Sequence, residues 1–343
     1  MYQARRPARS EFAPVRKLQY HVLRWGEASS VLPPLVLMHG WMDVAASYQF
    51  VVDAFSPAFL EGRTILAADW RGFGLTGLDT AGPPQGGGRP SPSEAQGSPA
   101  LGDSAAHAMP SGGATYTGHD NYWFPDYLAD LDFLLDHYVG DQPVDLVGHS
   151  MGGNVVMLYA GVRPQRIRRL VNLEGFGMPA TRPDQAPRRY AQWMDELKSL
   201  HRGEQALKAY ADAAGVARRL MKTNPRLPED KAQWLARQWA RPNAQGQWEI
   251  LGDAAHKIVN AQLYRVDEVL AAFAAITAPV LVVEASDNQM AQWWQGKYTL
   301  AEFHQRLQSV PRLQQARIQD AGHMLHHDQP AQLARLLENF LAD

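Results

Sequence analysis

The 343-residue sequence contains no cysteine. This absence excludes disulfide bonds, thiolate nucleophiles and zinc sites built on cysteine. The sequence also lacks an excess of charge, because 33 lysines and arginines stand against 35 aspartates and glutamates, for a formal net charge of −2. Binding to nucleic acid or to an anionic membrane is favoured by surplus positive charge, so the sequence predicts neither as a partner.

Long apolar runs are missing as well. No stretch approaches the roughly 20 apolar residues that a membrane-spanning helix needs. The basic first ten residues are not followed by the apolar segment of a secretory signal, so we expect a cytoplasmic protein. A hydrophobic content of 45% can supply a substantial core. The length favours one large domain that carries an insertion.

Short apolar runs recur along the chain and indicate strands buried on both faces, as in a parallel sheet. They lie at Leu35–Met38, Thr64–Ala68, Val144–Val147, Leu170–Leu173 and Val280–Val283, and Leu18–Trp25 alternates like a half-buried strand. Helix-like stretches separate them, at 44–59, 122–138, 151–162 and 330–341. This alternation predicts the α/β fold class, with a doubly wound and mostly parallel sheet.

Two segments interrupt the alternation. Residues 80–118 are rich in glycine, proline, serine and alanine, so we expect a flexible insertion that buries little apolar surface. Residues 177–276 carry helical patterns at 188–200, 204–221, 229–240 and 266–276, and they include Trp193, Trp234, Trp239 and Trp248. We interpret this second segment as a helical cap. The α/β core then comprises residues 15–176 and 277–343.

The segment Gly148–Gly152 has the pattern G-x-S-x-G, with Ser150 at its centre. It follows an apolar strand and precedes a helical stretch, which is the context of a nucleophile elbow. Glycines two residues before and after the serine relieve crowding in so sharp a turn. The helix that begins at Met151 also directs its N-terminal dipole toward developing negative charge. Ser150 is therefore the predicted nucleophile.

A serine nucleophile needs a base, and His323 is the candidate among 12 histidines. It follows the strand-like residues 316–319 and precedes the last helix, in the order that places nucleophile, acid and histidine along the chain. We interpret His326 and His327 as lining the start of that helix, and His149 as bracing the elbow. No pair of histidines has ligand spacing with a third ligand nearby, so we expect no metal.

Two carboxylates could orient the histidine and stabilise its cationic form. Asp287 follows the strand Val280–Val283 and is the favoured acid. Glu174 follows the preceding strand, Leu170–Leu173, and is the alternative.

Backbone N–H groups are expected to form the oxyanion hole. Met151 follows the nucleophile directly and offers one of them. Trp41, just after His39 and Gly40 at the end of an apolar run, offers the other.

These motifs together resemble the α/β-hydrolase superfamily over nearly the whole chain outside 80–118. Leu37–Trp41 resembles its oxyanion strand and turn, Asp69–Gly74 its Asp-x-Arg-Gly-x-Gly loop, Val147–Gly153 its elbow, and Gly322–His323 with Asp328–Pro330 its histidine loop. The family commonly has glycine where Glu284 stands, and some members place their acid where Glu174 lies. Related epoxide hydrolases and haloalkane dehalogenases use an aspartate at the elbow, so Ser150 argues against alkyl-enzyme chemistry.

The expected function is therefore hydrolysis of a small ester-like substrate through an acyl-enzyme, as in a carboxylesterase, with no metal or organic cofactor. The partner would be a small-molecule acyl substrate, and the cap tryptophans with Trp293 and Trp294 suggest an apolar pocket. Alternatives on the same fold are a carbon–carbon bond hydrolase, an amidase, a lactonase or an acyltransferase. From another class, a non-catalytic binding protein on a hydrolase fold remains an alternative.

Overall fold

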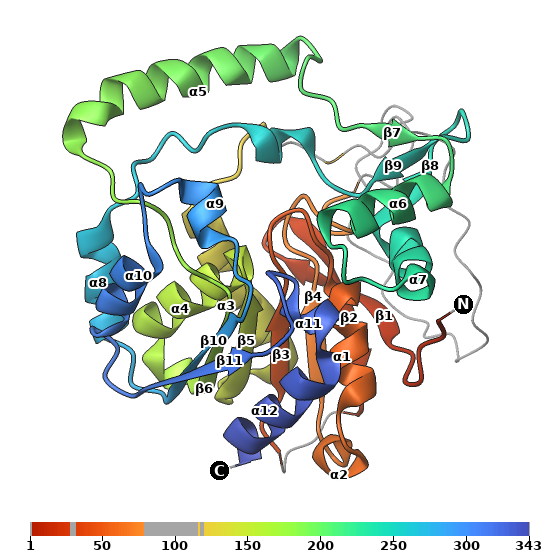
Figure 1. Ribbon diagram of the computed structural model, residues 1–343, viewed down its shortest axis with the longest axis vertical. Coiled ribbons are helices and arrows are strands. Elements are labelled where there is room, and N and C mark those ends of the chain that lie inside the picture. The colour runs from red at the N-terminus through yellow and green to blue at the C-terminus, as the bar shows by residue number, and fades with distance from the viewer. Residues whose placement is uncertain (1, 28–31, 79–115, 117–119, 343) are drawn as a thin grey trace, which may run out of the picture.

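A single large sheet organises the computed structural model, which describes residues 2–27, 32–78, 116 and 120–342 (Figure 1). Eight strands lie in the order β1-β2-β4-β3-β5-β6-β10-β11. Their bounds are β1 Arg9–Val15, β2 Leu18–Trp25, β3 Leu35–Met38, β4 Ile65–Ala68, β5 Val144–His149, β6 Ile167–Leu173, β10 Val280–Ala285 and β11 Leu313–Ile318. The pairs β1–β2 and β2–β4 are antiparallel, and the other neighbours are parallel. The mostly parallel, doubly wound fold is therefore confirmed.

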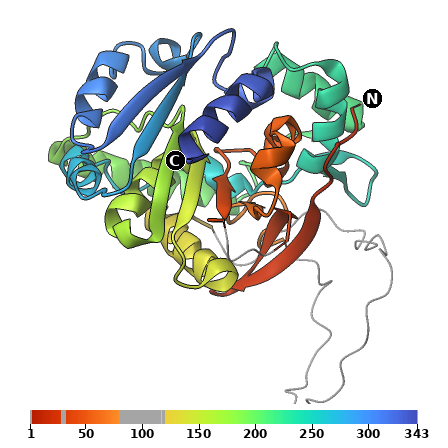
Figure 2. The same ribbon diagram turned by 90° about the horizontal axis from the view of Figure 1, so that it is seen from below.

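Alternating side chains along each central strand face two separate cores, because successive side chains of a strand point to opposite faces. In β3, Val36 and Met38 join one cluster, and Leu35 and Leu37 join the other. The first cluster also receives α3 (Phe124–Val139), α4 (Met151–Val162), α8 (Val266–Ala274) and α10 (Leu300–Leu307). The second receives α1 (Gln49–Ala54), α2 (Pro57–Leu60), α11 (Leu325–Asp328) and α12 (Pro330–Ala342). Figure 2 shows the sheet between these helix layers.

The segment between β6 and β10 contributes a separate set of elements, most of which lie at the top of Figure 1. They include α5 (Ala186–His201), α6 (Ala213–Thr223) and α7 (Glu229–Trp239), and a small sheet in the order β7-β9-β8. The strands of that sheet are β7 Ala209–Tyr210, β8 Ala240–Pro242 and β9 Trp248–Ile250. By contrast, α8 at the end of the segment packs its Val269 and Phe273 into the core cluster beside α4. The expected cap, residues 177–276, thus includes α8, a helix that packs in the core layer.

The bounds of several observed elements differ from the predicted ones. The helical pattern at 204–221 becomes a helix only from Ala213, because the Asp212 carboxylate accepts a hydrogen bond of 2.6 Å from the Gly215 amide and caps the helix there. Residues 209–210 before it form β7 instead. The stretch 44–59 divides into η1 (Ala45–Tyr48), α1 and α2. The insertion at 80–118 lies outside the described residues, apart from Tyr116.

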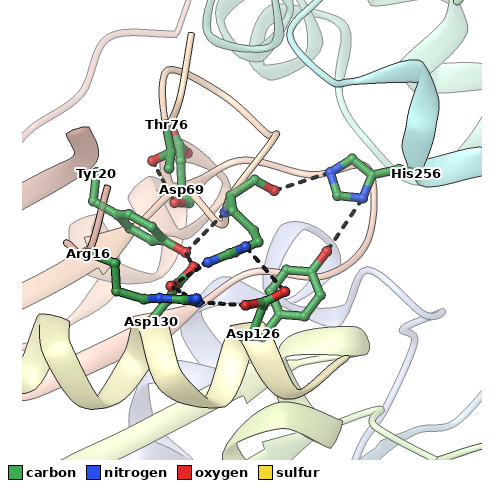
Figure 3. A network of polar contacts seen from close by, with 9 residues as sticks. Arg16, Tyr20, Asp69, Thr76, Asp126, Asp130 and His256 are labelled. Atoms are coloured by element: carbon green, nitrogen blue, oxygen red, sulfur yellow. Dashed lines mark hydrogen bonds and ion pairs between the residues drawn. The ribbon is translucent and has the colours of Figure 1, made fainter. Parts of the chain in front are cut away.

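A network of buried polar groups fixes the loop after β4 (Figure 3). The guanidinium of Arg71 makes two hydrogen bonds to Asp130 on α3, of 2.5 and 2.6 Å. The Tyr20 hydroxyl donates to the same carboxylate at 2.6 Å, and Arg16 lies 3.2 Å from it. The carbonyl oxygen of Arg71 lies 3.2 Å from Nε2 of His256, which comes from the inserted segment. The network thus connects strand β2, helix α3 and the inserted segment between β6 and β10.

Among the described helices, none combines the length and apolar character that a bilayer crossing demands.

Candidate active site

Ser150 occupies a sharp turn between β5 and α4. Its backbone has φ 52° and ψ −115°, a conformation that residues with a Cβ rarely adopt. The Ser150 amide donates to the Leu173 carbonyl at 2.8 Å, which ties the turn to the end of β6. Such a turn raises the serine side chain above the carboxyl edge of the sheet, at the N-terminus of α4.

The glycines on either side of Ser150 allow this turn because backbone atoms approach them closely. A Cβ atom at Gly148 would lie 2.3 Å from the Gly152 carbonyl oxygen. A Cβ atom at Gly152 would lie 2.3 Å from the Met38 carbonyl oxygen. Any side chain at these two positions would therefore displace the elbow or strand β3.

His323 lies in the loop between β11 and α11, and its imidazole contacts the predicted nucleophile. Its Nε2 is 2.9 Å from the Oγ atom of Ser150. The loop is held by a hydrogen bond of 2.8 Å from the Gly322 amide to the Asp328 carboxylate. The structure thus brings together Ser150 and His323, which are 173 residues apart in the chain.

Glu174 lies on the other side of the imidazole. Its Oε2 is 3.3 Å from the Nδ1 atom of His323, and its Oε1 accepts a hydrogen bond of 2.7 Å from the Ala285 amide. Burial raises the pKa of Glu174, against the opposing influence of its hydrogen bonds from His323 and Ala285. A carboxylate in this dry position interacts strongly with any positive charge that forms on the imidazole.

The backbone around Glu174 is specialised for this placement. Glu174 has φ 56°, in the left-handed region. The Asn172 side chain closes the turn with hydrogen bonds to both the amide and the carbonyl of Gly175, at 2.8 and 2.9 Å. The turn that follows β6 thus directs the Glu174 carboxylate toward His323.

The structure does not bring the carboxylate of Asp287 to His323. Strand β10 continues to Ala285, and the Asp287 amide then donates to the Ala321 carbonyl at 2.9 Å. The Asp287 side chain is 55% exposed and forms an ion pair with Arg226 of the inserted segment. Its backbone is near the histidine loop, but the carboxylate is directed toward Arg226. Glu284 is also engaged elsewhere, because it lies 2.5 Å from Nε2 of His304.

The expected oxyanion turn lies against the elbow. A Cβ atom built on Gly40 would be 3.0 Å from the Cβ atom of Ser150, so the backbone that leads to Trp41 passes beside the nucleophile. Met151 begins helix α4 immediately after Ser150. The side chain of Trp41 is exposed.

Trp293 of α9 (Met290–Trp294) packs its ring edge-on to the His323 ring, with 4.5 Å between the ring centroids. Its side chain is partly exposed, as is that of Trp41. Trp293 therefore adjoins His323 and is partly exposed to solvent.

His149, at the end of β5, contacts the backbone of the loop that carries His323. Its Nε2 lies 2.7 Å from the His323 carbonyl oxygen, and its side chain is buried. His326 and His327 lie in the short helix α11 before α12. The His149 and His326 rings lie with their centroids 4.4 Å apart, and Nε2 of His326 is 3.7 Å from Asp43 in the loop after β3. Sequence patterns do not predict these contacts, because the residues are far apart in the chain.

A serine on a nucleophile elbow, at the carboxyl edge of a doubly wound sheet, defines an α/β hydrolase. Residues 33–330 match the alpha/beta hydrolase fold family, and the chain belongs to that family.

Two curated relatives share parts of the sequence. A serine hydrolase-like protein of Danio rerio is 23% identical over 168 residues, which are 49% of this chain and 51% of that protein. A cis-3-alkyl-4-alkyloxetan-2-one decarboxylase of Shewanella oneidensis is 39% identical over 69 residues, which are 20% of this chain and 21% of the decarboxylase. The matched regions thus span about half of the first relative and a fifth of the second.

A solved structure extends the likeness to nearly the whole chain. The thioesterase domain from the curacin biosynthetic pathway has a TM-score of 0.70 and 21% identity, over 96% of this chain and 99% of that domain. At this identity the similarity demonstrates a common fold.

Proposed function

We propose that the protein is a serine hydrolase that cleaves an ester-like carbonyl substrate through an acyl-enzyme intermediate. One observation carries the proposal: Ser150, His323 and Glu174 form a continuous line of contacts at 2.9 and 3.3 Å. A nucleophile, a base and an orienting acid in this arrangement have the geometry of a catalytic triad.

In the proposed mechanism, His323 takes the proton from Ser150 while the serine oxygen attacks the carbonyl carbon. The amides of Trp41 and Met151 stabilise the negative charge on the tetrahedral intermediate. The His323 imidazolium then protonates the leaving group, and the acyl-enzyme forms. His323 next activates a water molecule that releases the acid and restores the serine.

We propose Glu174, rather than Asp287, as the acid of the triad. Glu174 is buried and reaches His323 Nδ1, whereas the Asp287 carboxylate is exposed and paired with Arg226. The Ala285 amide orients the Glu174 carboxylate, and the carboxylate favours the His323 tautomer that leaves Nε2 free to accept the serine proton.

The substrate class follows from the surroundings of Ser150. Trp293 packs against His323 and is partly exposed, and the exposed Trp41 follows the turn that passes beside Ser150, which favours an apolar acyl or alcohol portion. The names of the relatives agree with acyl chemistry at a serine, since one is a serine hydrolase-like protein and one structural neighbour is a thioesterase domain. The proposed reaction involves no organic cofactor.

A fluorophosphonate probe tests the proposal, because it reacts with an activated serine. We expect wild-type protein to be labelled at Ser150, and Ser150→Ala to remain unlabelled. Ser309 lies in the turn after α10, where its amide donates to the Arg306 carbonyl at 3.2 Å, so Ser309→Ala is a serine control that should label like wild type. Failure to label the wild type, or equal labelling of Ser150→Ala, would favour the non-catalytic binding protein. A panel of short and aromatic acyl esters, thioesters, amides, lactones and diketones then distinguishes ester hydrolysis from the other reactions of the fold.

A further inference from the structure

Three buried side chains converge beneath the proposed catalytic groups. Asp43 lies in the loop after β3, His149 ends β5, and His326 belongs to α11. Their exposed fractions are 3%, 1% and 0%. One ligand atom from each residue lies within 4.8 Å of those of the other two.

The converging atoms lack hydrogen-bond partners among the described residues. They are Oδ2 of Asp43, Nδ1 of His149 and both ring nitrogens of His326. A buried polar atom without a partner costs about 1–3 kcal/mol. Because one ligand atom from each of the three residues lies within 4.8 Å of the other two, and each residue has a buried atom without a partner, the cluster indicates a binding site for a ligand that all three residues can contact.

The remaining contacts of Asp43 and His149 fix which atoms are available. The other carboxylate oxygen of Asp43 accepts from the Val44 amide at 2.9 Å, from Trp239 Nε1 at 3.0 Å and from the Ser47 hydroxyl. Nε2 of His149 lies 2.7 Å from the His323 carbonyl oxygen, so Nε2 carries the proton and Nδ1 has a free lone pair. Oδ2 of Asp43 and Nδ1 of His149 thus remain without partners among the described residues.

We propose that Asp43, His149 and His326 bind one divalent transition-metal ion of the zinc type. Two imidazoles and a carboxylate are a usual set of protein ligands for Zn²⁺. The Asp43 Oδ2 and His326 Nε2 atoms are 3.7 Å apart, against roughly 3.4 Å for two ligands of a tetrahedral zinc ion. The hydrogen bond from His149 to the His323 carbonyl would orient that ligand in the manner of an outer-shell contact.

The ion would join three segments that the proposed reaction needs. Asp43 is two residues beyond Trp41, His149 precedes Ser150, and His326 is three residues beyond His323. A metal bound to these ligands would hold the oxyanion turn, the elbow and the histidine loop in register. Its role would be structural, because none of the three ligands belongs to the proposed triad of Ser150, His323 and Glu174.

Sequence spacing predicts no metal site because the ligands come from three distant segments. The competing explanation is a metal-free ion pair between the Asp43 carboxylate and the His326 ring. A bound metal can be counted per protein molecule and has its own absorption spectrum, whereas an ion pair has neither, so one experiment separates the two explanations.

The experiment uses the full chain, stripped with a chelator under partly denaturing conditions and refolded with Zn²⁺ or Co²⁺. After gel filtration we expect about one equivalent of metal in the wild type by mass spectrometry of the element. The melting temperature should rise with the metal. The Co²⁺ form should show the visible absorption of tetrahedral cobalt, and X-ray absorption should show two imidazole ligands.

One variant removes a proposed ligand, and two others are controls. His326→Gln should lose the metal, and the neighbouring His327→Gln should keep it. His323→Gln should also keep the metal, because it retains the backbone carbonyl that contacts His149 but removes an imidazole that could bind zinc at the triad.

The site is disproved if the wild type refolds without binding metal, or if His326→Gln retains a full equivalent. Loss of the metal from His323→Gln would instead place the ion at the triad. If His326→Gln does not fold, the decision rests on the number of imidazole ligands that X-ray absorption finds in the wild type and in His323→Gln. A number other than two in either protein overturns the proposal. Labelling of Ser150 by fluorophosphonate tests the proposed hydrolase separately.

Discussion

At the scale of single residues, Glu174 and Asp287 occupy equivalent places after neighbouring strands but have different surroundings. We expect Glu174→Gln to lower kcat by about ten-thousandfold, because an amide at this position favours the wrong tautomer of His323. Asp287→Asn should lower kcat less than about threefold, since its ion pair with Arg226 is exposed. Steady-state kinetics with an activated ester measure both effects.

The comparison carries its own controls. Circular dichroism should show that both variants are folded, and Glu174→Asp should recover part of the activity because it restores a carboxylate. A deep loss in Asp287→Asn with little change in Glu174→Gln would reverse the assignment of the acid.

Burial of Glu174 also has a consequence for stability. Its pKa is raised above 4.5 in the folded protein, so the folded state binds this proton more tightly than the unfolded state does. The resulting stabilisation is fully present below about pH 4 and is lost as the pH rises through the folded-state pKa. We therefore expect the stability of the wild type, relative to Glu174→Gln, to fall between acidic and neutral pH. Denaturant unfolding of both proteins at several pH values measures the difference, and a gap that widens in favour of the wild type would contradict it.

The sequence predicts the placement of Ser150 and His323 because each belongs to a local pattern, an elbow or a loop before the last helix. It favours Asp287 over Glu174, although both follow a buried strand at the same edge of the sheet, and our proposal now assigns the acid to Glu174. The choice depends on side-chain partners from elsewhere, namely Ala285 for Glu174 and Arg226 for Asp287. Such long-range contacts leave no periodic signal in the sequence.

At the scale of elements, the ion pair between Arg71 and Asp130 joins the loop after β4 to helix α3. The Asp130 side chain is fully buried, and Arg71 would remain without its main partner in Asp130→Asn. We expect this variant to lower the free energy of unfolding by about 3–5 kcal/mol, as for other broken buried pairs. Denaturant unfolding provides the measurement.

Asp136 provides a matched control on the same helix. It also pairs with an arginine, Arg166, but its side chain is 58% exposed. Asp136→Asn should cost no more than about 1 kcal/mol. Equal losses in the two variants would mean that burial does not determine the strength of the Arg71 pair.

Prediction of elements succeeds where burial on both faces produces apolar runs, and β2 and β3 have the expected bounds. It fails for β1, an edge strand in which only Ala13 and Val15 are buried, so that no apolar run marks it. The three short strands β7, β8 and β9 are missed for a related reason. Two or three residues are too few for a period-2 pattern.

At the scale of the whole molecule, one hydrogen bond connects the inserted segment to the loop beside the site. Trp239, at the end of α7, donates from Nε1 to Asp43 at 3.0 Å. Trp239→Phe keeps most of the apolar ring and removes this donor, so we expect a loss of about 1 kcal/mol in stability. Hydrogen exchange should also become faster in α7 and in residues 41–44.

Trp234→Phe is the appropriate control because Trp234 lies on the same helix and packs through its ring against Phe50. Faster exchange in residues 41–44 is expected only for Trp239→Phe. If both variants loosen that loop equally, the connection depends on general packing of α7 and not on the indole N–H.

Ser150 and Glu174 both have positive φ angles, 52° and 56°, at positions where the adjoining strands have just ended. An L-residue pays about 1–3 kcal/mol for a rare backbone conformation, and glycine is largely free of that penalty. The proposed nucleophile and acid are thus two of six described non-glycine residues with a positive φ, a conformation that glycine adopts with less strain. Ser150→Gly should consequently yield an inert protein that melts at a higher temperature than Ser150→Ala, which would mean that the backbone conformation at the proposed nucleophile lowers the thermal stability of the protein.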